Sequence, residues 1–458
     1  MNAPEPEREP EREPEPDPTR PDGRASGDAE SKRALASPPP PSKGRWRKGS
    51  AELNIKRRYR IQTDRNGSGA TIMRARKLVL HPLLGALAVG LASAAPLATA
   101  AELPREIVIG WSPPDVTGVF ATATEYFEKA AAEARKAGIN VRIITQSPAS
   151  HTDFGSQVAV LEDFIARKVS CIVVSPTEVE VVIPALQSAN RAGIPVIVVN
   201  LLEPIAGVKV ASYVGFDNAQ AGEISGYALL DYLGGPGVLG KGRMVPNPPR
   251  ALDLAFWREL YKGVKPADSP LQARVATIEG VAGGFFSTER LEGFHKAIDP
   301  FKGIKVVQNL PADWNRQKGV RAAEDILQAH KQLDAIWAAS NEMGMGAMSA
   351  VEAAGRQKQV GVLTNDGTPE SIGLIKEGRL VAETWHGFPE WGWYGTRFAV
   401  QAALGLPVPQ KYDIRPRTVH RGNADDFYPN VKLEPIPWAE IKRNAQEVAA
   451  RAGEPRGG

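Results

Sequence analysis

The amino-acid sequence predicts an α/β fold of two lobes, each built around a doubly wound parallel sheet. Short apolar runs alternate with amphipathic helical patterns, which indicates βαβ units whose strands are buried on both faces. The alternation occurs in two successive sets of similar size. Polar and aromatic residues recur where the apolar runs end, at the sheet edge where open α/β folds bind ligands. Two such lobes create a cleft between them, a standard place for a small ligand.

The first set of alternating patterns begins about one hundred residues into the chain. Its helical patterns end at glycines in two places, Gly138 and Gly193, as helices commonly do. The expected strands lie at 105–112, 140–146, 169–176 and 194–200, and the expected helices at 120–138, 153–168 and 180–193.

The alternation falters after residues 210–235 and then resumes. Residues 240–272 read as an inserted loop with one short aromatic helix in the stretch LAFWRELYKGV, which is either a lid or a partner surface. In the second set the expected strands lie at 273–280, 305–311, 333–340, 360–366 and 379–385, and the expected helices at 286–298, 315–330, 345–355, 369–378 and 392–405.

The first hundred residues differ in composition from the rest. Residues 1–72 are rich in Pro, Glu and Arg, with too little apolar surface to offset the entropy of ordering, so we expect disorder. Residues 73–100 have a basic start, an apolar centre and an A-T-A end, the pattern of a secretory signal peptide. A transmembrane anchor is the alternative, but the apolar part is short and carries Pro82. We expect Met73 to be the natural start and residues 1–72 to be untranslated.

Charge and cysteine content exclude several classes of protein. The 56 Lys and Arg against 52 Asp and Glu leave a net charge of +4, too small to indicate a nucleic-acid partner. The single cysteine, Cys171, excludes an internal disulfide and a cysteine-rich metal site, and its apolar surroundings indicate a buried small hydrophobe. The residue directly after the expected cleavage site is Ala101 and not a cysteine, which a lipid anchor would need. We therefore expect a protein exported to the periplasm from about Ala101, without a lipid anchor.

The common catalytic and cofactor motifs do not support an enzyme. G-x-x-x-x-G-K-[ST], G-x-S-x-G and H-E-x-x-H are absent. The stretch GPGVLG at 235–240 matches G-x-G-x-x-G, but it follows a helical pattern and runs into the insertion, so it reads as a loop. The six histidines are scattered. A Ser–His–Asp triad leaves no sequence signature, and nothing supports one here. We therefore expect no catalytic residues, no metal and no cofactor.

A set of residues at strand ends could hold a polyhydroxylated ligand. Hydroxyl groups need donors and acceptors, and the apolar faces of a sugar ring need flat aromatic surface. Each residue also has a plainer interpretation: the aromatics as core, the arginine as a solvated helix charge, and the Asn and Asp as helix caps. The candidates are Phe120, Asn200, Arg290, Trp314, Ser340, Asn341, Asp366 and His386.

Six stretches of the chain carry a resemblance to a known family: SCIVVSPTEVEVVIPALQSANRAGIPVIVVN, YVGFDNAQAGEISG, STERLEGFHKAI, ADWNRQKGVRAAEDILQAH, IWAASNEMGMGAMSAVEAAG and VLTNDGTPESIGLIKEGRLVAET. They resemble the periplasmic sugar-binding proteins of ABC transporters, of the ribose- and galactose-binding class. The resemblance spans about residues 106–406 and implies two Rossmann-like lobes, joined by a three-strand hinge, that close over one ligand. The lobes would comprise 101–213 with about 388–414, and 214–387 with the 240–272 insertion, followed by a tail at 415–458.

The resemblance also implies roles for individual residues. The Asp of the D-G-T-P loop, here Asp366, and the Arg of R-x-x-G-F, here Arg290, would bind sugar hydroxyls, while Phe120 and Trp314 would sandwich the ring. A carboxylate can accept from two adjacent hydroxyls and an Arg fork can donate to two oxygens, which fixes a small ring without any reaction.

Several positions depart from the ribose-binding pattern. Where ribose binders have Asp-Arg, this chain has Asn200 followed by Leu201. Ser340 replaces an Asn, His386 replaces an amide, and only Phe120 stands where two aromatics are usual. These changes leave a sugar, a polyol or a modified sugar as the expected ligand.

The resulting hypothesis is a non-enzymatic, monomeric solute-binding protein that delivers a sugar or polyol to the membrane permease of an ABC transporter. The alternative is a periplasmic sensor subunit that presents a sugar-like signal to a membrane receptor kinase. A third possibility, the ligand domain of a DNA-binding regulator, is disfavoured because residues 1–72 lack a helix-turn-helix pattern and the export signal contradicts a nucleic-acid partner.

Overall fold

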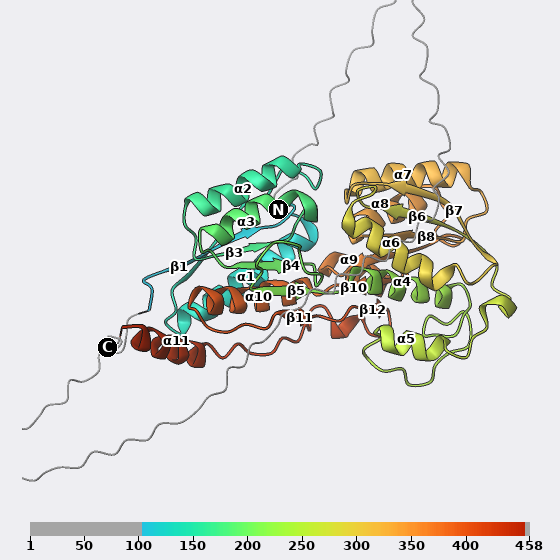
Figure 1. Ribbon diagram of the computed structural model, residues 1–458. Coiled ribbons are helices and arrows are strands. Elements are labelled where there is room, and N and C mark those ends of the chain that lie inside the picture. Colours follow the sequence, from blue (N-terminus) through green and yellow to red (C-terminus); the bar gives the residue numbers. More distant parts are fainter. Residues whose placement is uncertain (1–102, 454–458) are drawn as a thin grey trace, which may run out of the picture. The chain divides into compact units, whose positions relative to one another are not determined.

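The computed structural model describes residues 103–453. The expected extension at 1–72 and the expected signal peptide at 73–100 therefore lie outside the described residues. In the described part, two six-stranded sheets form the centres of two lobes, and helices cover both (Figure 1). This confirms the α/β fold class with two parallel-sheet lobes.

The first lobe contains a sheet in the order β11-β5-β4-β3-β1-β2, with every neighbouring pair parallel. Its strands are β1 (Ile107–Ser112), β2 (Val141–Thr145), β3 (Cys171–Val174), β4 (Val196–Val199), β5 (Ser212–Gly215) and β11 (Lys411–Asp413). Its helices are α1 (Gly118–Lys136), α2 (Phe154–Ala166), α3 (Val179–Arg191), α10 (Phe388–Ala403) and α11 (Trp438–Gly453).

Strand β3 explains why this lobe has helices on both faces of its sheet. All four of its residues are buried, and successive side chains point to opposite faces. Cys171 and Val173 pack in the core formed with α1 and α10, whereas Ile172 and Val174 pack in the core formed with α2 and α3. A strand covered on both sides needs a continuous apolar run, which is what the sequence provides.

The second lobe contains a sheet in the order β12-β10-β9-β8-β6-β7. Its strands are β6 (Ala273–Glu279), β7 (Ile304–Pro311), β8 (Ala335–Ala338), β9 (Gly361–Asp366), β10 (Ala382–Trp385) and β12 (Arg417–His420). Its helices are α4 (Asn218–Tyr232), α5 (Leu254–Tyr261), α6 (Phe285–Ile298), α7 (Arg316–Ala329), α8 (Asn341–Ala353) and α9 (Pro369–Glu377), with short 3₁₀ turns at Pro266–Asp268 and Ala424–Asp426. Among these strands only β12 is antiparallel to its neighbour.

The helices of the second lobe approach its sheet and one another closely. On β9, Thr364 faces Gly344 of α8, while the adjacent Asn365 accepts a 2.9 Å hydrogen bond from Ser225 of α4, so these helices cover opposite faces. Helices α4 and α6 meet through glycines: a Cβ on Gly222 would lie 2.0 Å from the carbonyl oxygen of Arg290. This contact fixes the position of α6, the helix that carries Arg290.

The chain passes between the two sheets at three places that lie close together in the fold. They are the segments between β5 and α4, between β10 and α10, and between β11 and β12. In the last passage, only residues 414–416 separate β11 from β12. The chain then enters the second sheet at its edge, where β12 pairs antiparallel with β10. The sequence pattern indicated only parallel strands, and did not separate β11, β12 or α11 as elements.

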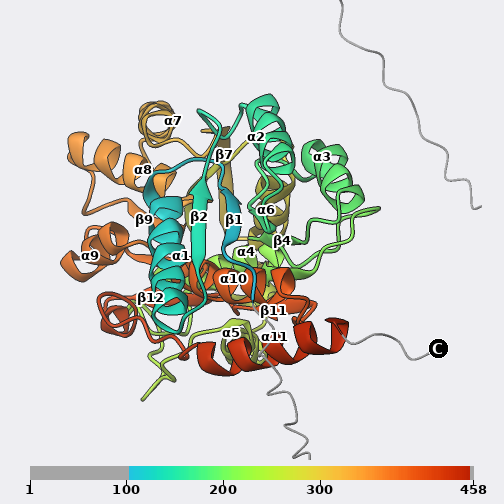
Figure 2. The same cartoon turned by 90° about the vertical axis from the view of Figure 1, so that its left-hand side faces the viewer.

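The C-terminal tail returns from the second lobe to the first. Residues of α11, including Trp438 and Ile441, join the core formed with α1 and α10. Before this helix, the Glu434 carbonyl accepts a 2.9 Å hydrogen bond from Trp393, and its N–H donates to Tyr394 over 3.0 Å. In Figure 2, α11 lies on the opposite side of α10 from β1 and β2.

The insertion carries α5 and packs against the second lobe. Trp257 is fully buried and donates a 2.9 Å hydrogen bond to Thr418 of β12. None of the helices between residues 103 and 453 is both long and apolar enough to cross a membrane.

Candidate functional site

The carboxyl ends of strands from both sheets line one cleft between the lobes. It encloses about 530 Å³ of space between protein atoms, part of which is open to solvent. Seven of the eight candidates from the sequence line it: Phe120, Asn200, Arg290, Trp314, Ser340, Asn341 and Asp366.

Arg290 extends from α6 into the cleft and is held in place by backbone and side-chain acceptors. Its Nε donates to Asn218 over 2.9 Å, and its Nη1 donates to the Ala339 carbonyl over 2.8 Å. The guanidinium also lies 5.3 Å from the ring centre of Trp314. Within the described residues, Nη2 has no hydrogen-bond acceptor, so this nitrogen is available to a ligand.

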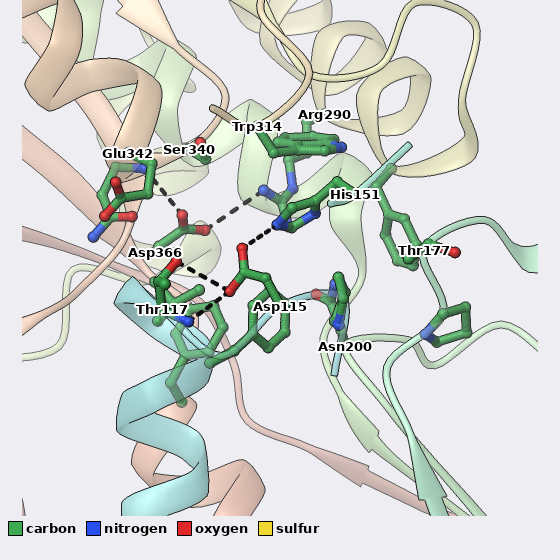
Figure 3. Close-up of a pocket in the computed structure, with 17 residues that line it drawn as sticks. Asp115, Thr117, His151, Thr177, Asn200, Arg290, Trp314, Ser340, Glu342 and Asp366 are labelled. Atoms are coloured by element: carbon green, nitrogen blue, oxygen red, sulfur yellow. Dashed lines mark hydrogen bonds and ion pairs between the residues drawn. The ribbon is translucent and has the colours of Figure 1, made fainter. Parts of the chain in front are cut away.

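Asp366 ends β9 and carries a charge that its neighbours stabilise. Burial alone would raise the pKa of Asp366, but nearby His386, the charge of Arg290 and the backbone N–H of Asn341 together hold it below its usual value. The Arg290 Nη1 lies 3.5 Å from Oδ1, and the Asn341 N–H donates to Oδ2 over 3.0 Å. The Asp366 side chain is therefore an ionised carboxylate that accepts hydrogen bonds in a buried position (Figure 3).

His386 is the one candidate that does not line the cleft. It is fully buried, with Nδ1 3.0 Å from Asp366 Oδ1 and its ring 4.2 Å from that of Phe216. Neither ring nitrogen has a hydrogen-bond partner among the described residues. Burial and the charge of Arg290 lower the pKa of His386 to about 4, although Asp366 opposes this shift, so the ring is neutral. The structure places His386 behind Asp366 rather than at the cleft surface.

Two amide oxygens in the cleft wall lack partners. Asn200 and Asn341 are both buried, and the Oδ1 atom of each has no hydrogen-bond donor among the described residues. The Asn341 Nδ2 donates to Thr368 over 2.9 Å, which fixes the orientation of its amide. Because a buried acceptor without a donor costs roughly 1–3 kcal/mol, these oxygens indicate a ligand that brings donors.

Several residues of the cleft have strained backbone conformations. Asn200, Trp314 and Asp366 have φ angles of 68°, 60° and 99°, in the left-handed region that favours glycine. Such strain costs on the order of 1–3 kcal/mol per residue and clusters at functional sites. Three strained residues around one cleft therefore support its assignment as the functional site.

Aromatic rings line the cleft on both sides. Phe120 lies in the first turn of α1 in the first lobe, and its ring lies 5.9 Å from that of Phe388 in an edge-to-face arrangement. Trp314 and Phe286 face it from the second lobe. Phe286 and Phe388 were not among the sequence candidates, because the family resemblance assigned the aromatic contacts to Phe120 and Trp314.

The sequence candidates also missed a polar group on the first lobe. Asp115 follows β1 and His151 follows β2, and their side chains are joined by a 2.7 Å contact between Oδ2 and Nε2. The Thr117 N–H donates to Asp115 Oδ1 over 2.9 Å. Both residues line the cleft opposite Arg290 (Figure 3). Asp115 and His151 follow strands as Asn200 and Asp366 do, so their positions after β1 and β2 are the sequence signal for them.

Glu383 lies buried beneath the loop that carries Asp366. It accepts hydrogen bonds from the Gly367 N–H over 3.1 Å and from Ser371 Oγ over 2.8 Å. Burial raises the pKa of Glu383 well above its usual range, despite the hydrogen bond from Ser371. Glu383 therefore supports the D-G-T-P loop from below without touching the cleft.

The described residues offer no obvious metal centre. Within 103–453, no group of three or more His, Cys, Asp and Glu side chains is placed to hold a metal ion. Cys171 is fully buried in the first sheet, and burial raises its thiol pKa. The arrangement in the cleft is suited to reversible binding through hydrogen bonds, an ion pair and aromatic faces.

Comparison with known proteins places this arrangement in a family. A family model for the periplasmic binding protein domain matches residues 109–407. The ribose import binding protein RbsB of Salmonella typhimurium is 28% identical over 282 residues, which cover 62% of this chain and 80% of that protein. A solute-binding protein of an ABC transporter from Bacillus halodurans C-125, solved with bound myo-inositol, is 25% identical with a TM-score of 0.56, over 70% of this chain and 96% of that one.

Two further solved structures share the fold. A periplasmic solute-binding protein of an ABC transporter from Actinobacillus succinogenes 130z, with bound D-allose, has a TM-score of 0.58 and 24% identity over 70% of this chain and 100% of that one. The fructose-binding periplasmic domain of a hybrid two-component system has a TM-score of 0.56 and 21% identity over 75% of this chain and 99% of that one. The family model spans most of both lobes, and the chain belongs to the periplasmic binding protein family.

Proposed function

We propose that this protein is an exported receptor that captures one uncharged sugar or polyol between its two lobes. The observation that carries the proposal is the composition of the cleft wall. Asp366 and Arg290 compensate each other's charge, while Arg290 Nη2 and the Oδ1 atoms of Asn200 and Asn341 have no partners among the described residues. A ligand with adjacent hydroxyl groups supplies the missing donors and acceptors together and adds no net charge.

The aromatic residues of the cleft support the same class of ligand. Phe120 and Trp314 come from opposite lobes and offer flat apolar surface. The C–H faces of a sugar or polyol ring pack against such surfaces while its hydroxyls point sideways to polar groups. The names of the relatives, which specify ribose and myo-inositol, are consistent with this chemistry.

Closure of the lobes would be the signal of occupancy. Contacts between the lobes already exist, because the Phe285 N–H of α6 donates to Glu178, the residue before α3, over 3.0 Å. A ligand that touches both lobes stabilises the closed arrangement, because it binds that arrangement better than an open one. His386 would act through Asp366, as a neutral neighbour that positions the carboxylate.

The proposed partner is the membrane permease of an ABC transporter, reached in the periplasm by a monomeric receptor. A sensor role is the second candidate, because the same fold serves as the periplasmic domain of a hybrid two-component system. Deleting the gene separates the two roles. Loss of uptake of the labelled ligand supports the transport role, whereas normal uptake with loss of the transcriptional response supports the sensor role.

The ligand class is tested by calorimetry and thermal unfolding on protein purified from the periplasm after expression of the full chain. Pentoses, hexoses, polyols and amino acids are compared. A ligand at about 100 times its Kd stabilises the protein by roughly 2.7 kcal/mol. Binding should be lost in Asp366→Asn and Arg290→Ala, and retained in the surface control Arg142→Ala, whose side chain pairs with Glu106 away from the cleft. Binding restricted to amino acids would overturn the ligand class.

A further inference from the structure

A second chamber continues the ligand cleft outward between the two lobes. It encloses about 1230 Å³ of space between protein atoms, more than twice the 530 Å³ of the inner chamber, and both values include space open to solvent. The two chambers adjoin, because they share five wall residues: Asp115, Thr117, His151, Trp314 and Glu342.

The outer chamber has one wall from each lobe. Residues 149–152 of the loop between β2 and α2 form the wall on the first lobe. Residues 313–318, the turn after β7 and the start of α7, form the wall on the second lobe. A group that bridges these walls contacts both lobes, as the ligand of the inner chamber does.

The charged side chains of the outer chamber already have partners. Asp115 pairs with His151, and Lys318 pairs with Asp313. Arg316 binds both carboxylate oxygens of Glu342, over 2.8 and 2.9 Å. A charged ligand would have to displace one of these partners, and the walls therefore favour an uncharged group.

The uncharged polar side chains of the outer chamber remain available. Gln317 is exposed, and its amide has no hydrogen bond within the described residues. The Asn315 Oδ1 accepts from the Lys318 N–H, which leaves its Nδ2 free to donate. Ser150 and Thr152 share one 3.2 Å hydrogen bond and keep further lone pairs exposed. The hydroxyl groups on the wall of the first lobe and the amide groups on the wall of the second lobe suit a ligand with several hydroxyl groups.

We propose that the ligand has two units, with one neutral ring in the inner chamber and a second hydroxylated unit, such as another sugar ring, in the outer chamber. The link between them passes between His151 and Trp314, which line both chambers from opposite lobes. The proposal rests on the proposed function, because it assigns the inner ring to the same site. It narrows the ligand class from free monosaccharides to disaccharides and glycosides.

The test compares disaccharides with their component monosaccharides by calorimetry on the protein purified from the periplasm. The probes are sucrose, trehalose, maltose, cellobiose and melibiose, each beside its component sugars. At least one disaccharide should bind about tenfold or more tightly than either component. The double variant Ser150→Leu/Gln317→Leu should weaken that disaccharide about tenfold and leave monosaccharide binding within about twofold, because it removes one polar group from each wall.

The matched control is Gln357→Leu, an exposed glutamine that lines neither chamber, and it should bind both sugars as the unaltered protein does. Monosaccharides that bind as tightly as every disaccharide would overturn the two-unit ligand and leave the proposed function intact. Tight disaccharide binding that survives the double variant would likewise overturn it. A failure of every carbohydrate to bind would overturn the proposed function itself, and the two failures are thereby distinguished.

Discussion

The guanidinium of Arg290 lies 3.5 Å from the carboxylate of Asp366, and each side chain is only 4% exposed. Each charge is therefore buried with the other as its main counter-charge. Removing one partner of such a pair leaves the other uncompensated, which typically costs about 3–5 kcal/mol of folding free energy. The pair therefore contributes to the stability of the second lobe, and both of its residues also line the cleft.

This relationship predicts a non-additive double-mutant cycle. Arg290→Met and Asp366→Asn should each lower the free energy of unfolding by roughly 3–5 kcal/mol. The free energy of unfolding of the double variant should fall by clearly less than the sum of the two single losses, because no charge remains buried alone. Urea unfolding measures all three stabilities, and ligand binding should be absent in all three. Additive losses would contradict the coupling.

A second prediction concerns the glycine contact between α4 and α6. A Cβ on Gly222 would lie 2.0 Å from the Arg290 carbonyl oxygen, so Gly222→Ala must push α6 and its arginine away. We expect a loss of roughly 1–3 kcal/mol in stability and at least about tenfold in ligand affinity.

The control for this prediction is Gly373→Ala in α9, where an added Cβ meets no atom within 4 Å. Alanine there should stabilise the helix by about 0.5–1 kcal/mol and leave ligand binding unchanged. Thermal unfolding and calorimetry on both variants provide the comparison. Equal ligand affinities in the two variants would show that the α4–α6 contact does not position Arg290.

A third prediction follows from the buried imidazole. The pKa of His386 is lowered from 6.5 to about 4, so the unfolded chain takes up a proton at a pH where the folded protein does not. Stability is therefore lost as the pH falls from 6.5 towards 4. Proton linkage at this residue alone lowers the free energy of unfolding by about 2 kcal/mol between pH 7 and pH 5. Urea unfolding at both pH values should show a smaller loss for His386→Gln; an identical loss would contradict the neutral buried ring.

The fourth prediction has the opposite sign and concerns the carboxyl beneath the D-G-T-P loop. The pKa of Glu383 is raised well above 4.5, so its stabilising contribution is complete below pH 4.5 and declines as the pH rises towards the folded value. Glu383→Gln keeps the side-chain shape and removes the titration. The stability of this variant relative to the unaltered protein should increase from pH 4.5 to pH 8. A constant difference across that range would refute the buried, protonated carboxyl.

The sequence was informative wherever a local pattern decides the structure. The run from Cys171 to Val174 predicted a strand buried on both faces because nothing polar interrupts it, and the structure confirms this. The strand-end positions of Asn200 and Asp366 likewise predicted residues that line the cleft. In these cases neighbouring residues along the chain carry the whole signal.

The sequence was uninformative where the decisive contact is distant. Strand β12 has four residues and exists because β10 offers it an edge, and α11 is set by apolar side chains on α1 and α10. His386 follows a strand as the other candidates do, and only its packing on Phe216 reveals that it faces inward. Such outcomes depend on how the two sheets are assembled, which no local periodicity records.

The returning tail joins the two lobes outside the three passages between the sheets. Tyr428 is held to the second lobe by a 2.7 Å hydrogen bond from Lys376, whereas Glu434 is held to the first lobe by Trp393 and Tyr394. The short segment between these anchors spans no more than about 22 Å when fully stretched. While both anchors hold, the segment acts as a tether of fixed maximum length, which bounds how far these two points of the lobes can separate.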